Sequence, residues 1–322
     1  MFSRRSILRF SAAAGAAWAV NSFSQGRRPI TIVVGYAPGG SPDFVARLIA
    51  ERLQGRLGRP VIVENKSGAN GQLALAAVQN AAPDGSTYAL VPPGPLTIFP
   101  SLYRKLAFDG TLLQPILAPV SFEHAVATSN ATRATSLADF LALAKSDPGK
   151  ALFGVPAAGS PPHFVGLLLG KSAGIALQPV VYRGGPPMLV DLMGNQVPLA
   201  INVMSNFVEH HRSGKLRVLA TTGNQRSALL QDVPTLSELG FKQATVQEWY
   251  AFVARKDAVP AETAAFVSAA REVVQLREVR AALLASGHAP ADIDAQALAA
   301  DIARNRERWS MLIKEADLKV ET

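Results

Sequence analysis

The stretch from residue 30 to residue 53, ITIVVGYAPGGSPDFVARLIAERL, most constrains what this chain can fold into. It opens on five β-branched residues, 30–34, which are typical of a buried strand. Residues 38–42, PGGSP, predict a sharp turn, and apolar residues then recur at helical spacing. Ser41 is expected to be the N-cap of that helix. A strand that leads through glycines into a helix start gathers unpaired backbone N–H groups, which predicts an anion-binding site.

The same order of elements returns about one domain length later. Residues 151–155, ALFGV, read as a strand, residues 158–162, AGSPP, as a turn, and a helix is expected from Phe164 onward. The chain therefore holds two Gly-Ser-Pro helix starts, at residues 40–42 and 159–161. We predict that these two starts face each other across a cleft and bind one ligand carboxylate from both sides.

Between the two units, the chain up to residue 91 alternates strand, helix, strand, helix and strand, which predicts a parallel, doubly wound sheet. Residues 92–95, PPGP, follow at the end of the third strand, where such folds place ligands. The apolar stretch 116–128 is expected to cross to a second domain, and residues 216–221 to return from it. The length of 322 residues also favours two domains.

Composition excludes several classes of protein. The net charge of +8 could indicate nucleic-acid binding, but the basic residues are scattered, so a basic exterior that favours anionic ligands is the preferred interpretation. Cysteine is absent, which excludes disulfides and thiolate metal sites. Glu123, His124, His210 and His211 do not have metal-ligand spacing and are interpreted as surface or hinge groups. No cofactor and no metal are expected.

Residues 1–26 have the pattern of a signal peptide. Basic residues precede a mild apolar stretch, and Ala17-Trp18-Ala19 offers a cleavage site. The pair Arg4-Arg5 resembles a twin-arginine export signal, and an ordinary Sec signal fits equally well. The apolar run is shorter than the roughly 20 residues needed to span a membrane. We therefore expect an exported, periplasmic protein from which this segment is removed.

Several blocks in the chain resemble the Bug-type periplasmic solute-binding receptors of tripartite tricarboxylate transporters. The blocks occur in order over nearly the whole mature chain: 28–31 RPIT, 39–43 GGSPD, 63–65 VEN, 68–71 GANG, 82–85 APDG, 102–106 LYRKL, 159–163 GSPPH, 182–184 YRG, 191–194 DLMG, 213–217 SGKLR and 233–235 VPT. The resemblance implies a two-domain Venus-flytrap fold, each domain a mostly parallel sheet flanked by helices. Domain I would be residues 27–122 and 222–322, and domain II residues 123–221. The protein would be a monomer that captures a small carboxylate and delivers it to membrane transporter subunits.

The resemblance also implies a set of ligand-binding residues. Tyr36, Ala37, Gly39, Gly40, Ser41 and Asp43 would form the first wall, Ala158, Gly159, Ser160 and His163 the second, and Tyr182 and Asn202 would lie nearby. For six of these residues, a purely structural role remains an alternative to ligand binding. Both serines could simply cap their helices, both tyrosines could pack at the domain edge, and His163 could bond a neighbouring loop. For Asp43 the structural role is favoured, because a carboxylate facing an anionic ligand would repel it.

Two departures from the family pattern bear on the ligand. Residues 161–162, PP, stand where relatives often have Ser or Thr, and residues 92–95, PPGP, replace a more polar loop. Proline has no N–H to donate, so the pocket is expected to be stiff and apolar. This predicts a ligand with one carboxylate and an apolar or aromatic body rather than citrate.

Two other functions were weighed. A receptor that reports to a membrane signalling protein has the same sequence features. A periplasmic hydrolase is disfavoured, because no Gly-x-Ser-x-Gly, His-Glu-x-x-His or Walker motif occurs. A triad of Ser41, Asp43 and His163 is conceivable, but the capping role would occupy the oxygen of Ser41. The chain is therefore not expected to be an enzyme.

Overall fold

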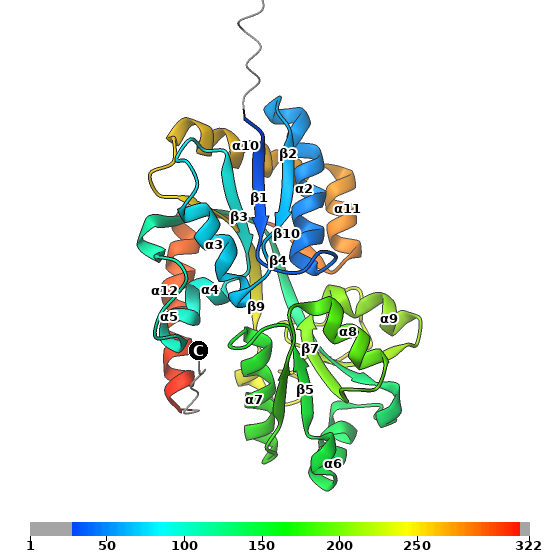
Figure 1. The fold of residues 1–322 in the computed structure, drawn as a ribbon. Helices are drawn as coiled ribbons and strands as arrows, with labels where there is room; N and C mark the ends of the chain where they lie inside the picture. The colour runs from blue at the N-terminus through cyan, green and yellow to red at the C-terminus, as the bar shows by residue number, and fades with distance from the viewer. Residues whose placement is uncertain (1–27, 316–322) are drawn as a thin grey trace, which may run out of the picture.

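The computed structural model describes residues 28–315, which form two α/β lobes joined by strands (Figure 1). The expected two-lobed fold is confirmed. The predicted signal peptide, residues 1–26, lies outside the described residues. No helix within residues 28–315 is long and apolar enough to cross a membrane.

The first lobe is built around the β-branched strand predicted at its start. Strand β1 (Ile30–Val34) pairs in parallel with β2 (Val61–Asn65) and β3 (Thr87–Val91), and β9 (Gln247–Arg255) joins β3 in antiparallel orientation. The edge is completed by β10 (His288–Asp294), which pairs with β4 (Leu113–Ser129). The helices of this lobe are α2 (Ser41–Leu57), α3 (Gln72–Gln79), α4 (Gly94–Thr97), α5 (Phe99–Leu102), α10 (Pro260–Gln275), α11 (Arg277–Ala285) and α12 (Ala295–Glu315).

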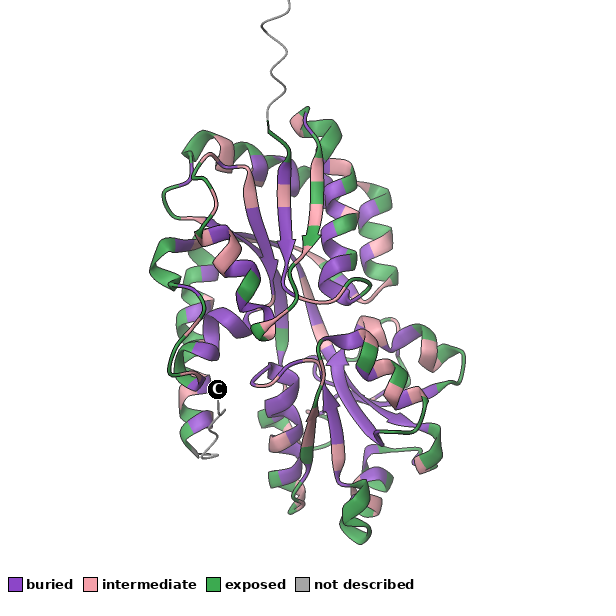
Figure 2. Ribbon diagram, viewed as in Figure 1, coloured by how far each residue is buried: buried purple, intermediate pink, exposed green. Residues whose placement is uncertain are grey.

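The second lobe repeats the parallel arrangement on a smaller scale. Strand β5 (Leu152–Val155) lies between β6 (Gln178–Val181) and β7 (Leu199–Val203) and is parallel to both. Strand β8 (Leu216–Thr221) pairs antiparallel with β4. The helices of this lobe are α6 (Leu137–Ser146), α7 (Pro161–Ala173), α8 (Gly185–Met193) and α9 (Val208–Arg212). Figure 2 shows that the central strands of both lobes are mostly buried, whereas the edge strands β2 and β6 are intermediate or exposed.

One long strand, β4 (Leu113–Ser129), connects the lobes. Its residues up to Glu123 pair with β9 in the first lobe, and from His124 onward they pair with β7 and β8 in the second. The stretch expected to cross between domains therefore lies within one continuous strand. Because β4 and β9 run side by side where the lobes meet, they are the elements that a rotation of one lobe against the other would bend.

The domain boundaries stay a prediction, and the packing of residues 222–246 bears on them. Leu230 and Val233 pack in one cluster with Phe207 of the second lobe, and Leu236 packs in another with Phe153. We therefore propose that the second crossing is placed at the start of β9 rather than at residue 222.

The two lobes touch each other in this structure. The side-chain amide of Asn70 in the first lobe donates to the carbonyl of Ala158 in the second, at 3.4 Å. A Cβ added to Gly159 would lie 2.1 Å from Cδ2 of Leu102, so α5 packs directly on the loop before α7. These contacts describe a closed arrangement of the lobes.

Candidate functional site

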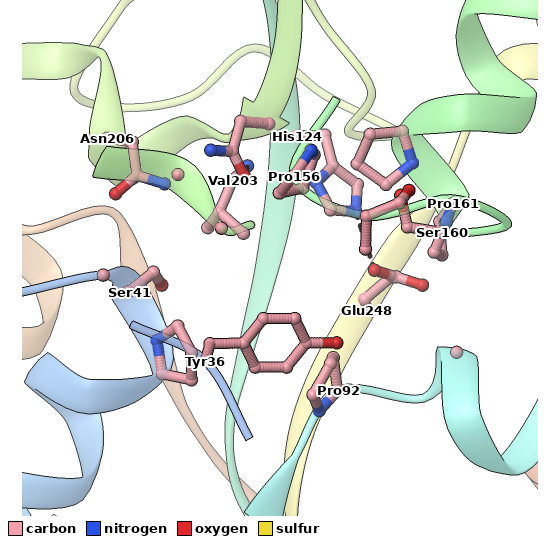
Figure 3. Close-up of a pocket in the computed structure, with 18 of the residues that line it drawn as sticks. Tyr36, Ser41, Pro92, His124, Pro156, Ser160, Pro161, Val203, Asn206 and Glu248 are labelled. Carbon is pink, nitrogen blue, oxygen red and sulfur yellow. Dashed lines mark hydrogen bonds and ion pairs between the residues drawn. The ribbon is translucent and has the colours of Figure 1, made fainter. Parts of the chain in front are cut away.

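A cavity of about 620 Å³, its mouth included, lies between the lobes (Figure 3). It is lined by the starts of α2, α4, α7 and α8 and by the facing parts of β4, β7 and β9. The carboxyl ends of the parallel strands β1, β3 and β5 lead into its walls, which is where open α/β sheets place ligands.

Six of the twelve predicted ligand residues line this cavity: Tyr36, Ala37, Gly40, Ser41, Ser160 and Asn202. The other six, Gly39, Asp43, Ala158, Gly159, His163 and Tyr182, are not among its lining residues. The two serines thus do border one space from opposite lobes. The role of any of these residues in binding a ligand stays a prediction.

The first helix start differs from the expected capping. The N-cap of α2 is Gly40, in extended conformation, so Ser41 is the first helical residue and its side chain makes no cap hydrogen bond. Its hydroxyl instead belongs to a buried chain of hydrogen bonds. Tyr250 donates to Ser41 Oγ at 2.9 Å, and Ser41 Oγ lies 2.7 Å from His288 Nε2.

The direction of this chain follows from its far end. Ser286 Oγ donates to the carbonyl of Leu283 at 2.8 Å, so it accepts from His288 Nδ1, 2.9 Å away. Nδ1 therefore carries the proton of the neutral imidazole, and Nε2 accepts from Ser41. The proton of the Ser41 hydroxyl is directed to His288 and away from the cavity.

The hydroxyl of Ser160, at the start of α7, also donates to a group of the protein itself. Ser160 is the N-cap of α7, but no N–H is free for its hydroxyl: Pro162 has none, and the N–H of His163 donates to the Ser160 carbonyl at 2.9 Å. Ser160 Oγ donates to the carbonyl of Ala157 instead, at 2.7 Å. Neither serine hydroxyl therefore presents a free proton to the cavity.

The predicted residues outside the cavity support the loops beside it. Asp43 accepts from the N–H of Gly39 at 2.9 Å, from Arg47 at 3.0 Å and from Asn65 at 2.9 Å. Burial opposes ionisation of Asp43, but the hydrogen bonds from Arg47 and the other donors outweigh it and lower its pKa. The favoured structural role of Asp43 agrees with these contacts.

His163 and Tyr182 likewise bond to protein groups. His163 Nδ1 accepts from the N–H of Gly159 at 2.9 Å, so the histidine bonds a neighbouring loop, one of the two alternatives left open. The hydroxyl of Tyr182 donates to Asp191 at 2.8 Å. Its pKa is raised to about 12, first by burial and then by that carboxylate.

Two asparagines, Asn202 in β7 and Asn206 in the 3-10 turn after it, place side-chain amides at the cavity. Asn202 is 3 % exposed, and its Nδ2 has no hydrogen-bond partner among residues 28–315. A Cβ added to Gly185 would lie 2.7 Å from the Nδ2 atoms of both Asn202 and Asn206, so both amides meet the first residue of α8. Asn206 was missed at the sequence level, because it lies in the 3-10 turn after β7 and no motif marks it.

The starts of α8 and α2 lie against each other. A Cβ added to Gly40 would be 3.7 Å from Cδ of Pro186, and one added to Gly184 would be 3.8 Å from Cβ of Ala37. The positive ends of two helices and two side-chain amides therefore meet at one side of the cavity. Together they can bind an anion.

The opposite side of the cavity holds one acidic residue. Glu248 of β9 is 5 % exposed, and its Oε2 lies 2.7 Å from Nε2 of His124 in β4. His124, interpreted from the sequence as a surface or hinge group, is buried and lies where the pairing of β4 passes from β9 to β7, which fits the second alternative. No lysine or arginine lines the cavity within the described chain.

A metal site and hydrolase chemistry find little support here. Within residues 28–315 no three His, Cys, Asp or Glu side chains are grouped to hold a metal ion. Ser41 and His288 are placed like a nucleophile and its base. However, the residue after Ser41 is Pro42, which lacks the N–H that a serine-hydrolase elbow gives to its oxyanion hole.

Two buried histidines, His163 and His288, make stability depend on pH. Burial lowers the pKa values of His163 and His288 to about 4. Because the folded-state pKa lies below the unfolded value near 6.5, the contribution of each histidine to stability is fully present above pH 6.5 and is lost as the pH falls toward 4.

We expect His163→Asn, which keeps an acceptor for Gly159, to reduce this loss by up to about 1.4 kcal/mol per pH unit. Urea unfolding at several pH values measures it. His210→Asn, at a half-exposed histidine, is the control, and equal slopes in both variants would contradict the prediction.

Comparison with known proteins gives consistent matches. Residues 45–318 match the model of the tripartite tricarboxylate transporter family receptor. Protein BugT of Bordetella pertussis is 32 % identical over 316 residues, 97 % of this chain and 96 % of that protein. Two solved structures are similar in fold: R. palustris Rpa4515 with adipate (TM-score 0.87, 26 % identity, 92 % of this chain and 99 % of that one) and MatC from Rhodopseudomonas palustris with bound malate (TM-score 0.82, 26 % identity, 89 % and 99 %).

Proposed function

The chain belongs to the tripartite tricarboxylate transporter receptor family, and we propose that it binds the carboxyl group of its ligand where α2 and α8 begin. It is a solute-binding receptor for small carboxylates, in a family of periplasmic binding proteins rather than of enzymes. We propose further that it is exported by the signal peptide at residues 1–26. As a monomer, it would deliver its ligand to membrane transporter subunits.

The observation that carries this placement is the unpartnered amide of Asn202. A buried N–H without a partner costs free energy, so an acceptor that fills the site is favoured. Asn202 and Asn206 meet at Gly185, where the first turn of α8 adds its positive dipole. The α2 start completes the site from the other lobe. We thus propose that the starts of α2 and α8 bind the carboxylate, whereas the sequence pattern predicted that the starts of α2 and α7 bind it.

The body of the ligand would lie against apolar walls. Proline rings from both lobes line the cavity, together with Phe99 and Phe122: Pro42, Pro92, Pro156, Pro161, Pro162 and Pro186. These rings present apolar surface, and none of the prolines has an N–H. This supports a ligand with one carboxylate and an apolar or aromatic body. Adipate and malate are the ligands of the related structures, and both carry two carboxylates.

Ligand capture would proceed by closure of the lobes. The donors from α2 lie in the first lobe and those from α8, Asn202 and Asn206 in the second, so the carboxylate is fully bound only when the lobes meet. Each charge-assisted hydrogen bond contributes roughly 1.5–3 kcal/mol. Three or four such bonds are enough for micromolar affinity after the cost of closure. Bending of β4 and β9 would permit the opening.

Asn202→Asp tests this placement. The substitution keeps the oxygen that accepts from the N–H of Val203 at 2.8 Å and replaces the free donor by a negatively charged acceptor. We expect the affinity for a monocarboxylate such as hexanoate or benzoate to fall by about a hundredfold or more, from one lost charge-assisted bond and added repulsion. Isothermal titration calorimetry measures it.

Asn224→Asp is the control for that experiment. Asn224 is exposed and does not line the cavity, so the variant adds the same charge elsewhere. Equal affinities of Asn202→Asp and the control would show that the carboxylate is bound at another place.

A further inference from the structure

We propose that the ligand carries an ammonium or a comparable N–H donor at the end remote from its carboxylate, and that Glu248 binds this group. The inference rests on the proposed function and identifies the class of ligand as an amino-carboxylate with an apolar spacer. It is carried by the one acidic side chain in the cavity and by the groups around it.

Glu248 is arranged to accept a further hydrogen bond. One carboxylate oxygen, Oε2, is paired with Nε2 of His124 at 2.7 Å. Its other oxygen has no hydrogen-bond partner among residues 28–315. Figure 3 shows Glu248, Ser160 and Pro161 on one side of the cavity and Asn206 and Ser41 on the other. The acceptor and the proposed anion site therefore lie at different ends of one space.

The hydroxyls near Glu248 cannot satisfy that oxygen. Tyr36 donates its proton to the carbonyl of Asn70 at 3.2 Å, and Ser160 donates to Ala157. Both hydroxyls line the cavity, and each keeps lone pairs that can accept. This end of the cavity is thus rich in acceptors, which favours a donor on the ligand.

The charge balance favours the same class of ligand. Glu248 is 5 % exposed, and the cavity lining includes no lysine or arginine. A purely anionic ligand would bring one more negative charge into this poorly solvated space, and a dicarboxylate would bring two. An amino-carboxylate brings no net charge into the cavity, and its ammonium would place a positive charge next to Glu248. His124 Nε2 is paired with one oxygen of Glu248, and its Nδ1 has no partner in the described chain.

Pairs of ligands with equal shape test the inference on the unaltered protein. The aliphatic pair is 5-aminopentanoate and hexanoate, and the aromatic pair is 4-(aminomethyl)benzoate and 4-ethylbenzoate; in each pair a methyl group replaces the ammonium. We expect the amino-carboxylate of at least one pair to bind about tenfold to a hundredfold more tightly in calorimetry, which corresponds to one charge-assisted hydrogen bond. Adipate is expected to bind more weakly than hexanoate.

Glu248→Gln tests the residue itself. The substitution removes the charge and is expected to abolish the preference for the amino-carboxylate, while the affinity for the methyl analogue stays the same or rises. Glu123→Gln is the matched control, because Glu123 is the adjacent residue to His124 in β4 and does not line this cavity. The comparison of ligands on the unaltered protein decides the inference even if Glu248→Gln does not fold.

Each outcome has one meaning. If the methyl analogues bind as tightly as the amino-carboxylates in both pairs, or if adipate binds most tightly, the inference is wrong while the receptor function stands. If Glu248→Gln keeps the preference for the ammonium, Glu248 is not the group that binds it. If none of these carboxylates binds, the proposed function fails, and the inference fails with it.

Discussion

Gly185→Ala is expected to reduce the affinity for a carboxylate ligand by about a hundredfold or more, although it adds a single methyl group. Gly185 begins α8, and the new Cβ would lie 2.7 Å from the amide nitrogens of Asn202 and Asn206. Both side chains have to move aside, which removes two donors, each worth roughly 1.5–3 kcal/mol to a bound carboxylate. The φ angle of Gly185 is not positive, so alanine fits the backbone and the fold is expected to remain intact. Calorimetry with hexanoate and thermal unfolding of the ligand-free protein measure the two effects.

Gly55→Ala is the matched control. Gly55 lies in the last turn of α2, and a Cβ added there meets no atom within 4 Å. We expect unchanged affinity and a small gain in stability, because alanine is favoured over glycine in a helix interior. If Gly185→Ala binds hexanoate as well as Gly55→Ala does, the asparagines at the α8 start are not the donors.

Trp309→Ala is expected to reduce the free energy of unfolding by about 3–5 kcal/mol, the range measured for loss of a large aromatic side chain from a core. Trp309 is 2 % exposed, and its ring centroid lies 5.0 Å from that of Phe164. Trp309 belongs to α12 on the first lobe and Phe164 to α7 on the second, so this contact also helps to hold the lobes together. Chemical denaturation measures the loss.

Met311→Ala, in the same helix, separates the core contact from helix formation. Met311 is 54 % exposed, and its replacement is expected to change stability by no more than about 0.5 kcal/mol. A comparable loss of stability in both variants would show that the effect comes from the helix and not from the contact with Phe164.

Local patterns in the sequence predicted the framework of the fold. The β-branched run and the glycine turn at residues 30–42 correctly placed β1 and the start of α2, because both depend on residues close in the chain. The crossing strand was also found, since an apolar stretch of that length is buried on both sides. Strand β10 was missed, because HAPADID holds a proline and few β-branched residues and forms by pairing with β4. Residues 260–285 alternate apolar and polar residues like one long amphipathic helix, but they form two helices, α10 and α11, separated at Leu276.

The site was predictable in its location but not in its hydrogen bonds. Both Gly-Ser-Pro turns border one cavity, as the repeated pattern indicated. The direction of the Ser41 hydroxyl depends on His288, 247 residues away, and on Tyr250, 209 residues away, so no local pattern contains it. The same holds for Glu248 and His124, which are 124 residues apart and meet only because β4 and β9 pair. Partners that are brought together by the sheet cannot be read from spacing along the chain.

A crystal structure of the protein with hexanoate would test the placement of the carboxylate most directly. We expect the lobes to be closed around the ligand, with carboxylate oxygens within hydrogen-bond distance of Asn202 Nδ2, of the N–H of Gly185 at the start of α8 and of backbone N–H groups at the start of α2. A carboxylate found at the start of α7, or outside the cavity between the lobes, would contradict the account.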